Sequence, residues 1–261
     1  MKKVIILTIV VALFSVMFVG CYEGGITAIR GEGEIVTQTL ELRDFDEVEL
    51  AGSFDVVVSY GDGYEVVVEG HQNIIDRLET RNINGNLQFK LRRGSYRDFH
   101  LVVYITVPDI NAVELSGSGE IYINAFDGLD KLDLEINGSG DIISDEYVNV
   151  DEINFNICGS GDIDFLTNAT DASIDVSGSG NIKIAGTSVT QEIDINGSGD
   201  IFGFDFITDE TNIHISGSGN CEVYVNNILN ITIAGSGDVF YKGQPQIDLN
   251  ISGSGTVHNG N

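Results

Sequence analysis

The feature that most constrains this fold is a tripeptide, Gly-Ser-Gly, that occurs eight times between residue 117 and the end of the chain. Successive copies are 18 to 21 residues apart. Self-similarity at such a period is the sequence signature of a solenoid, in which each repeat forms one coil. The glycines of these GSG tripeptides are Gly117, Gly119, Gly138, Gly140, Gly159, Gly161, Gly178, Gly180, Gly197, Gly199, Gly217, Gly219, Gly235, Gly237, Gly253 and Gly255.

The residues that flank the GSG tripeptides alternate between apolar and polar side chains. Leu132, Leu134 and Ile136 are one apolar set before a tripeptide, and another apolar side chain follows each first glycine by four residues. This alternation predicts strands, not helices. The glycines then form tight corners, because glycine reaches positive φ freely and leaves room for the backbone of the next coil. Residues 111–261 are therefore predicted to be an all-β solenoid, a β-helix of seven coils with three short strands each and minimal helix.

Residues 34–110 are also rich in strand patterns but lack the regular repeat. Ala51-Gly52-Ser53-Phe54 resembles an imperfect copy of the corner, with Phe54 in place of the second glycine. Gly52 lies 65 residues before Gly117, which is about three coil lengths. This region is either the irregular first coils of the same solenoid or a separate sandwich.

The first residues have the pattern of an export signal. Lys2 and Lys3 precede an apolar run from Val4 to Val19, which ends at Gly20-Cys21. The alternative interpretation of this apolar run is an uncleaved membrane anchor, but the run is short for a segment that crosses a bilayer. The junction resembles the lipobox of bacterial lipoproteins, which implies cleavage after residue 20 and acylation of Cys21. The residue after the cysteine is Tyr22, whereas a retention signal for the inner membrane would have an aspartate there. The resemblance therefore favours the outer membrane as the destination. Residues 1–20 are thus read as a lipoprotein signal peptide and 21–33 as a flexible tether.

Charge excludes several classes of partner and activity. The chain has 40 Asp and Glu against 13 Lys and Arg, a net charge of −27, which disfavours nucleic acid as a ligand. Six of the basic residues lie between Arg77 and Arg97, whereas residues 111–261 hold 24 acids and three lysines. Acidic polymers are repelled by such a surface. A carbohydrate-active enzyme, hydrolase or lyase, is therefore only the alternative, and no catalytic or cofactor-binding residue is assigned.

Two aspartates form the candidate calcium site. Asp141 and Asp162 follow successive GSG tripeptides, so stacking would bring their carboxylates within about 4.8 Å, and calcium could bridge them. Asp and Asn are also common turn formers, which explains this column without a metal. A transition-metal site around His214 is a weaker candidate. Cys158 and Cys221 are expected to lie on different faces, three coils apart, and to remain free thiols.

The last coil has no obvious cover for its apolar edge. Only six residues follow Gly255 in the sequence. We expect either pairing with another subunit, which would make a homo-oligomer through the solenoid end, or a cap donated by the N-terminal region.

Several segments together resemble the head GIN domain family of autotransporter adhesins, between about Asp44 and Val257. The resemblance rests on Phe45 with the segment Val48 to Val56, on Ile105-Thr106-Val107-Pro108, on the repeated Gly-Ser-Gly-Asp-Ile units and on Tyr241-Lys242-Gly243-Gln244-Pro245. It implies a right-handed single-stranded β-helix and a cell-surface adhesive or structural role. The expected partners are the membrane, through the lipid, and a surface glycan or protein ligand.

Overall fold

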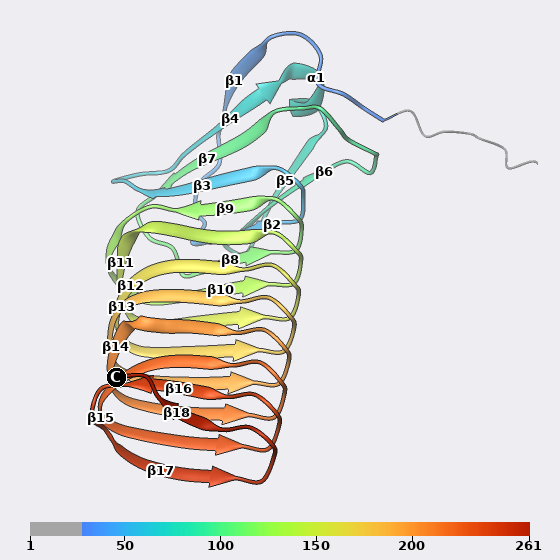
Figure 1. Ribbon diagram of the computed structural model, residues 1–261. Coiled ribbons are helices and arrows are strands. Elements are labelled where there is room, and N and C mark those ends of the chain that lie inside the picture. The colour runs from blue at the N-terminus through green and yellow to red at the C-terminus, as the bar shows by residue number, and fades with distance from the viewer. Residues whose placement is uncertain (1–27) are drawn as a thin grey trace, which may run out of the picture.

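The computed structural model describes residues 28–261, which form eighteen strands and one four-residue helix (Figure 1). All eighteen strands join one continuous sheet that winds into a rod. The predicted fold class, an all-β solenoid with about 20 residues per coil, is confirmed. The described residues contain no helix long and apolar enough to cross a membrane.

The coils are built from strands that pair in parallel with the coil before and the coil after. Alternate side chains point inward and stack into apolar columns. Ile142 pairs with Ile163, which pairs with Ile182, and all three are at most 1% exposed. The strands are β8 (Ala112–Leu115), β9 (Glu120–Ile123), β10 (Phe126–Ile136), β11 (Asp141–Ile157), β12 (Ile163–Val176), β13 (Ile182–Ile195), β14 (Ile201–Ile215), β15 (Cys221–Ile233), β16 (Val239–Lys242), β17 (Gln246–Ile251) and β18 (Val257–Asn259).

The three short strands expected in each coil appear in β11 to β15 as one long strand of 13 to 17 residues. In β11 the alternation of buried and exposed residues breaks twice, at 145–147 and at 151–152, so the strand turns two corners. Pairing with the next coil continues through the second corner, where Glu152 lies opposite Asp171. The second corner therefore changes direction without ending the hydrogen-bonded ladder, whereas at the first corner the register shifts between Ser144 and Val148.

The GSG tripeptides form the remaining corner, but positive φ is not the reason for their glycines. The glycines with positive φ are Gly33, Gly85, Gly128, Gly186 and Gly243, and none belongs to a GSG tripeptide. That part of the prediction is wrong. The reason is close approach, since a Cβ on any of the sixteen glycines would lie 1.8–2.0 Å from a carbonyl oxygen of the preceding coil. The coils are this close because backbone bonds cross the corners, such as Ser139 N–H to Gly117 O at 2.9 Å.

The N-terminal residues form an irregular cap that is continuous with the solenoid. The Gly52 corner stacks directly against Gly117, because Leu50 pairs with Leu115 and Val56 with Ile121. The 64 intervening residues therefore do not form three coils, and they do not form a separate sandwich. Part of this segment forms one further parallel layer on the end of the rod. The rest adds strands that pair antiparallel. The elements are β1 (Ile35–Leu40), β2 (Glu47–Leu50), β3 (Asp55–Tyr60), β4 (Glu65–His71), α1 (Gln72–Ile75), β5 (Leu78–Ile83), β6 (Asn86–Leu91) and β7 (Leu101–Val107).

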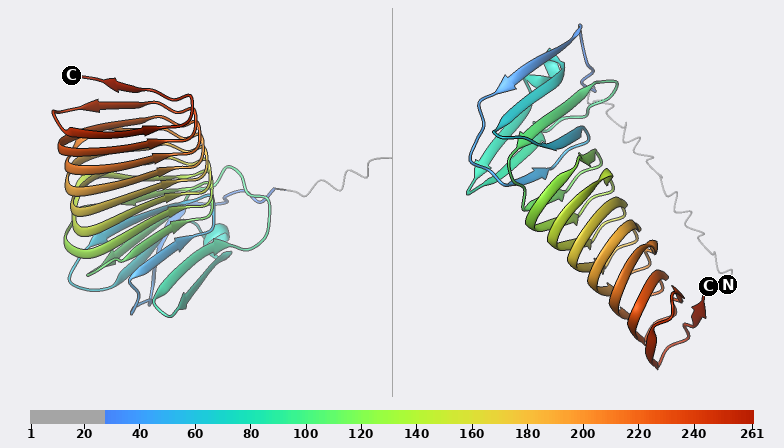
Figure 2. Two further views of the ribbon diagram at one scale, coloured as in Figure 1. Left: turned by 90° about the horizontal axis from the view of Figure 1, so that it is seen from below. Right: turned by 90° about the vertical axis from the view of Figure 1, so that its left-hand side faces the viewer.

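The cap and the last coil lie at opposite ends of the rod (Figure 2). The expectation that the N-terminal region covers the last coil is therefore wrong for residues 28–110. Strand β4 pairs antiparallel with β7, and β1 pairs antiparallel with β4, so these strands cover the first coil instead. The last two strands have one pairing partner each among the described residues, since β17 pairs with β15 and β18 with β16.

Candidate functional site

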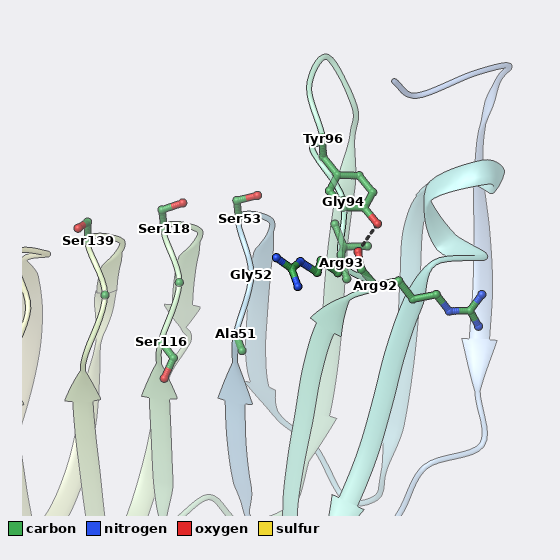
Figure 3. Close-up of a pocket in the computed structure, with 13 residues that line it drawn as sticks. Ala51, Gly52, Ser53, Arg92, Arg93, Gly94, Tyr96, Ser116, Ser118 and Ser139 are labelled. Carbon is green, nitrogen blue, oxygen red and sulfur yellow. Dashed lines mark hydrogen bonds between the residues drawn. The ribbon is translucent and has the colours of Figure 1, made fainter. Parts of the chain in front are cut away.

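A groove forms where the cap meets the row of GSG corners. Strand β6 pairs in parallel with β2, with Phe89 opposite Leu50, so the chain leaves β6 beside the Gly52 corner. In this layer a longer loop, residues 92–100, takes the place of the GSG tripeptide before β7 begins. The loop projects beyond the row of corners and forms one wall of the groove (Figure 3).

The loop is held in place by backbone and side-chain contacts. Ile29 donates its N–H to the carbonyl of Ser95 at 2.7 Å and accepts the N–H of Arg97 at 3.1 Å. The Tyr96 hydroxyl donates to the carbonyl of Arg92. Arg30 forms an ion pair with Asp98 at 3.0 Å. The described end of the predicted 21–33 tether is thus fixed to the cap, and the loop is ordered before any ligand arrives.

The groove has a volume of about 440 Å³ and two chemically different walls. The first is the row of corners, with the hydroxyls of Ser53, Ser118 and Ser139. The second carries Arg93 and Tyr96. Figure 3 shows the Arg93 side chain pointing toward Gly52, whereas Arg92 points away from the corners. A guanidinium beside hydroxyls and a phenol ring offers hydrogen-bond donors for an anionic group.

The groove lies at a basic segment of an acidic chain, and Arg92 and Arg93 of that segment line it. Residues 72–100 contain six Lys and Arg against three Asp and Glu. Arg92 lies 3.6 Å from the carboxylate of Glu79, but Arg93 has no ion pair within 28–261. A charge without an internal partner, on an ordered loop at a groove, is available to a ligand.

A second hollow, of about 280 Å³, lies on the side of the rod. At this place the inward column carries Ala172, Gln191 and Thr211, between Ile153 and Leu229 of the neighbouring coils. Its lining includes the carboxylates of Glu152, Asp171 and Glu192, but no aromatic ring. Carboxylates without a platform for a sugar ring do not make a distinctive glycosidase site.

The column that contains Asp141 and Asp162 forms a ladder of hydrogen bonds along the rod. The Asp141 carboxylate accepts the backbone N–H of Asp162 at 2.9 Å, and Asp162 accepts the N–H of Asn181 at 2.6 Å. Asp200, Asn220, Asp238 and Thr256 continue the pattern. Within residues 28–261 no group of three or more His, Cys, Asp or Glu side chains could hold a metal ion. The calcium site stays a prediction, and the ladder already gives these side chains a role.

The two described cysteines differ in their exposure to solvent. Cys158 is an exposed free thiol, and Cys221 is a buried one in the inward column. Burial raises the pKa of the Cys221 thiol, so it remains protonated at neutral pH. Cys21, the predicted lipidation site, lies outside the described residues.

Sequence reasoning did not assign Arg93 or Tyr96 to a site. The signal that could have found them is the concentration of basic residues between Arg77 and Arg97 in an acidic chain. Their neighbours in the groove, Gly52, Ser118 and Ser139, come from distant segments, so the site itself exists only in the folded structure.

Comparisons with known proteins agree with this architecture. A family model described as "Putative auto-transporter adhesin, head GIN domain" matches residues 44–245. A crystal structure from Parabacteroides distasonis, described as a putative lipid binding protein, is 26% identical with a TM-score of 0.83, and the alignment covers 90% of this chain and 100% of that chain. A putative adhesin from the same organism is 24% identical with a TM-score of 0.83, over 89% of this chain and 99% of that one.

A third crystal structure, a putative adhesin from Parabacteroides merdae, is 20% identical with a TM-score of 0.81 and covers 90% of this chain and 99% of its own. None of the curated proteins compared with the chain matches it.

Proposed function

Since this chain belongs to the head GIN domain family, whose description is "Putative auto-transporter adhesin", we propose that it is an exported, lipid-anchored binding protein of the cell envelope. Acylated Cys21 attaches it to the membrane, most simply the outer membrane, and the solenoid serves as a rigid acidic support. The ligand binds in the groove between the loop of residues 92–100 and the GSG corners. The proposed ligand is an acidic saccharide.

The observation that carries this proposal is the orientation of Arg93. Its guanidinium has no ion pair among the described residues and points toward the Gly52 corner in a groove of about 440 Å³. Ligand pockets are commonly of this size. A carboxylate or sulfate could pair with Arg93, the serine hydroxyls could bond to sugar hydroxyls, and the Tyr96 ring could pack against a sugar face.

A lipid is the other ligand that the comparisons raise, because one solved relative is described as a putative lipid binding protein. The lining of the groove supports it less well. Ala51 and Leu91 supply the aliphatic side chains there, and the remaining lining residues are Gly, Ser, Arg and Tyr96. An acyl chain would bury little apolar surface in such a groove, whereas an anionic headgroup would meet the same arginine.

Calorimetry of the detergent-solubilised full chain tests the proposal with three probes: a digalacturonate, the neutral galactose disaccharide, and phosphatidylglycerol micelles. We expect the digalacturonate to bind at least tenfold more tightly than the neutral sugar, and more weakly at high salt. Arg93→Ala should weaken binding by at least tenfold, because the charged partner is lost.

Arg81→Ala is the matched control, since Arg81 is an exposed cap arginine outside the groove. It removes the same charge and should change affinity less than twofold. Equal binding of both sugars, or equal losses in the two variants, would overturn the acidic-saccharide site. Binding of phosphatidylglycerol alone, lost in Arg93→Ala, would assign the groove to lipid headgroups instead.

A further inference from the structure

The last coil of the solenoid presents an apolar sheet edge. Ile247, Leu249 and Ile251 of β17 pair with Leu229, Ile231 and Ile233 of β15, which are at most 2% exposed. The β17 residues thus extend the inward columns by one layer, yet they are 37%, 48% and 40% exposed. Within residues 28–261, β17 pairs with β15 alone, so its other edge has free N–H and C=O groups (Figure 2).

Charge distinguishes this end from the rest of the rod. Residues 111–238 hold 23 acids and two lysines, whereas residues 239–261 hold one lysine and one acid, Lys242 and Asp248. Two copies that approached along their sides would bring strongly acidic surfaces together. Two copies that approach through their last coils meet no such repulsion, because both surfaces are neutral overall.

We propose that the last coil binds the last coil of a second copy of this chain, with β17 pairing antiparallel to its partner about a two-fold axis at Leu249. Antiparallel partners that face each other have residue numbers that add to a constant. An axis at Leu249 places Leu249 opposite Leu249 and Ile247 opposite Ile251. The same register places Asp248 opposite Asn250, so no two carboxylates face each other.

Neighbouring registers fit less well. A shift of one residue would place Leu249 opposite Asp248 and Ile247 opposite Asn250, which mixes apolar and charged side chains on both faces. A shift of two residues keeps apolar residues opposite each other but leaves Ile247 opposite Gly253 or Ile251 opposite Pro245. The Leu249 register pairs Ile247, Leu249 and Ile251 with one another and so joins the two cores into one. Both copies use the same surface in this contact, so association stops at a dimer. The two N-terminal caps then lie at the two outer ends of the dimer.

The first test is the mass of the full chain by sedimentation equilibrium in density-matched detergent, up to roughly 100 µM, a range that detects weak dimers. Cys21→Ser protein serves in parallel to exclude association through acyl chains. We expect a dimer for both. Leu249→Lys should be monomeric, because it places two cations against each other in an apolar interface.

Val189→Lys is the matched control for that variant. Val189 is an exposed valine, 51% accessible, in β13 in the middle of the rod. It gains the same charge at an exposed apolar position away from the end, so it should remain a dimer. A wild-type chain that stays monomeric, or a Leu249→Lys chain that still dimerises, would overturn the proposal.

The register is tested by moving one charge. Asn250→Asp would place a new carboxylate opposite Asp248 of the other copy, twice in the dimer, and should weaken association by at least about tenfold at low salt. Adding Asp248→Asn to that variant removes both like-charge pairs and should restore association. Failure of the second change to rescue the first would reject the Leu249 register, and growth into longer polymers would show head-to-tail contact instead.

Discussion

At the scale of single residues, the coil spacing depends on the absence of a side chain. A Cβ on Gly197 would lie 2.0 Å from the carbonyl oxygen of Gly178. Gly197→Ala should therefore force the coils apart, strain the bond from Ser198 N–H to Gly178 O, and lower the free energy of unfolding by about 1–3 kcal/mol.

The neighbouring Ser198 supplies the control for denaturant unfolding of Gly197→Ala. Ser198 is exposed, and its replacement by alanine should change stability by less than about 0.5 kcal/mol. If the glycine and serine variants unfold at the same denaturant concentration, close approach does not explain the repeat.

Cys21 is the residue on which the proposed membrane attachment depends. Several acyl chains would hold the protein firmly, at about 0.8 kcal/mol for each buried CH₂. The mature protein should partition into the detergent phase, and Cys21→Ser should move it to the aqueous phase. An intact mass showing Cys21 unmodified, or Met1 retained, would contradict lipidation.

At the scale of one element, the aspartate ladder connects coil to coil. Asp238 accepts both the N–H and the hydroxyl of Thr256 at 2.7 Å, and these bonds lower the pKa of its carboxyl group. A lowered folded-state pKa stabilises the fold above the unfolded pKa of about 3.9, and this contribution disappears as pH falls through the folded value.

Asp238→Asn should therefore melt below wild type at pH 7, and the difference should vanish under acid as Asp238 becomes protonated. Melting curves from pH 7 to about pH 2, below both pKa values, would show this, and Thr256→Val should reduce the pH-dependent part. A difference that stays constant over the whole pH range would show that the charge on Asp238 does not matter.

The same ladder bears on calcium. If Asp141 and Asp162 serve as backbone acceptors, excess calcium and excess magnesium should raise the melting temperature equally, as ionic strength does. A larger increase with calcium that disappears in Asp162→Asn would instead support the bridged cation site.

At the scale of the whole molecule, the two ends of the rod differ in charge as well as in structure. Its middle is strongly acidic, the cap carries most of the basic residues, and the last coil is neutral overall. Carboxylates stacked at about 4.8 Å repel, and salt screens them. Raising NaCl from about 10 to 300 mM should increase the melting temperature by about 2–4 °C for each kcal/mol of repulsion removed. Glucose at equal osmolality should not reproduce this increase.

Local pattern determined the architecture of residues 111–261. The spacing of Gly117, Gly138 and Gly159 gives the coil length, and alternating residues such as Leu132 and Leu134 give the inward columns. Coil length and side-chain alternation are both set by residues close together in the sequence. Each further coil has the same length and alternation, so the stack follows from one repeat. For the same reason the exposed apolar edge at the last coil followed from the repeat alone.

Only the tertiary structure decided why the corners need glycine, how the cap is ordered and where the groove lies. Positive φ and close approach both select glycine, and they differ only once the neighbouring coil is present. In the cap, β6 and β7 follow β2 and β3 in the chain but stack on their outer side, which no local pattern encodes. The groove brings Arg93 beside Gly52 and Ser118, and contacts over such sequence distances depend on the path of the whole chain.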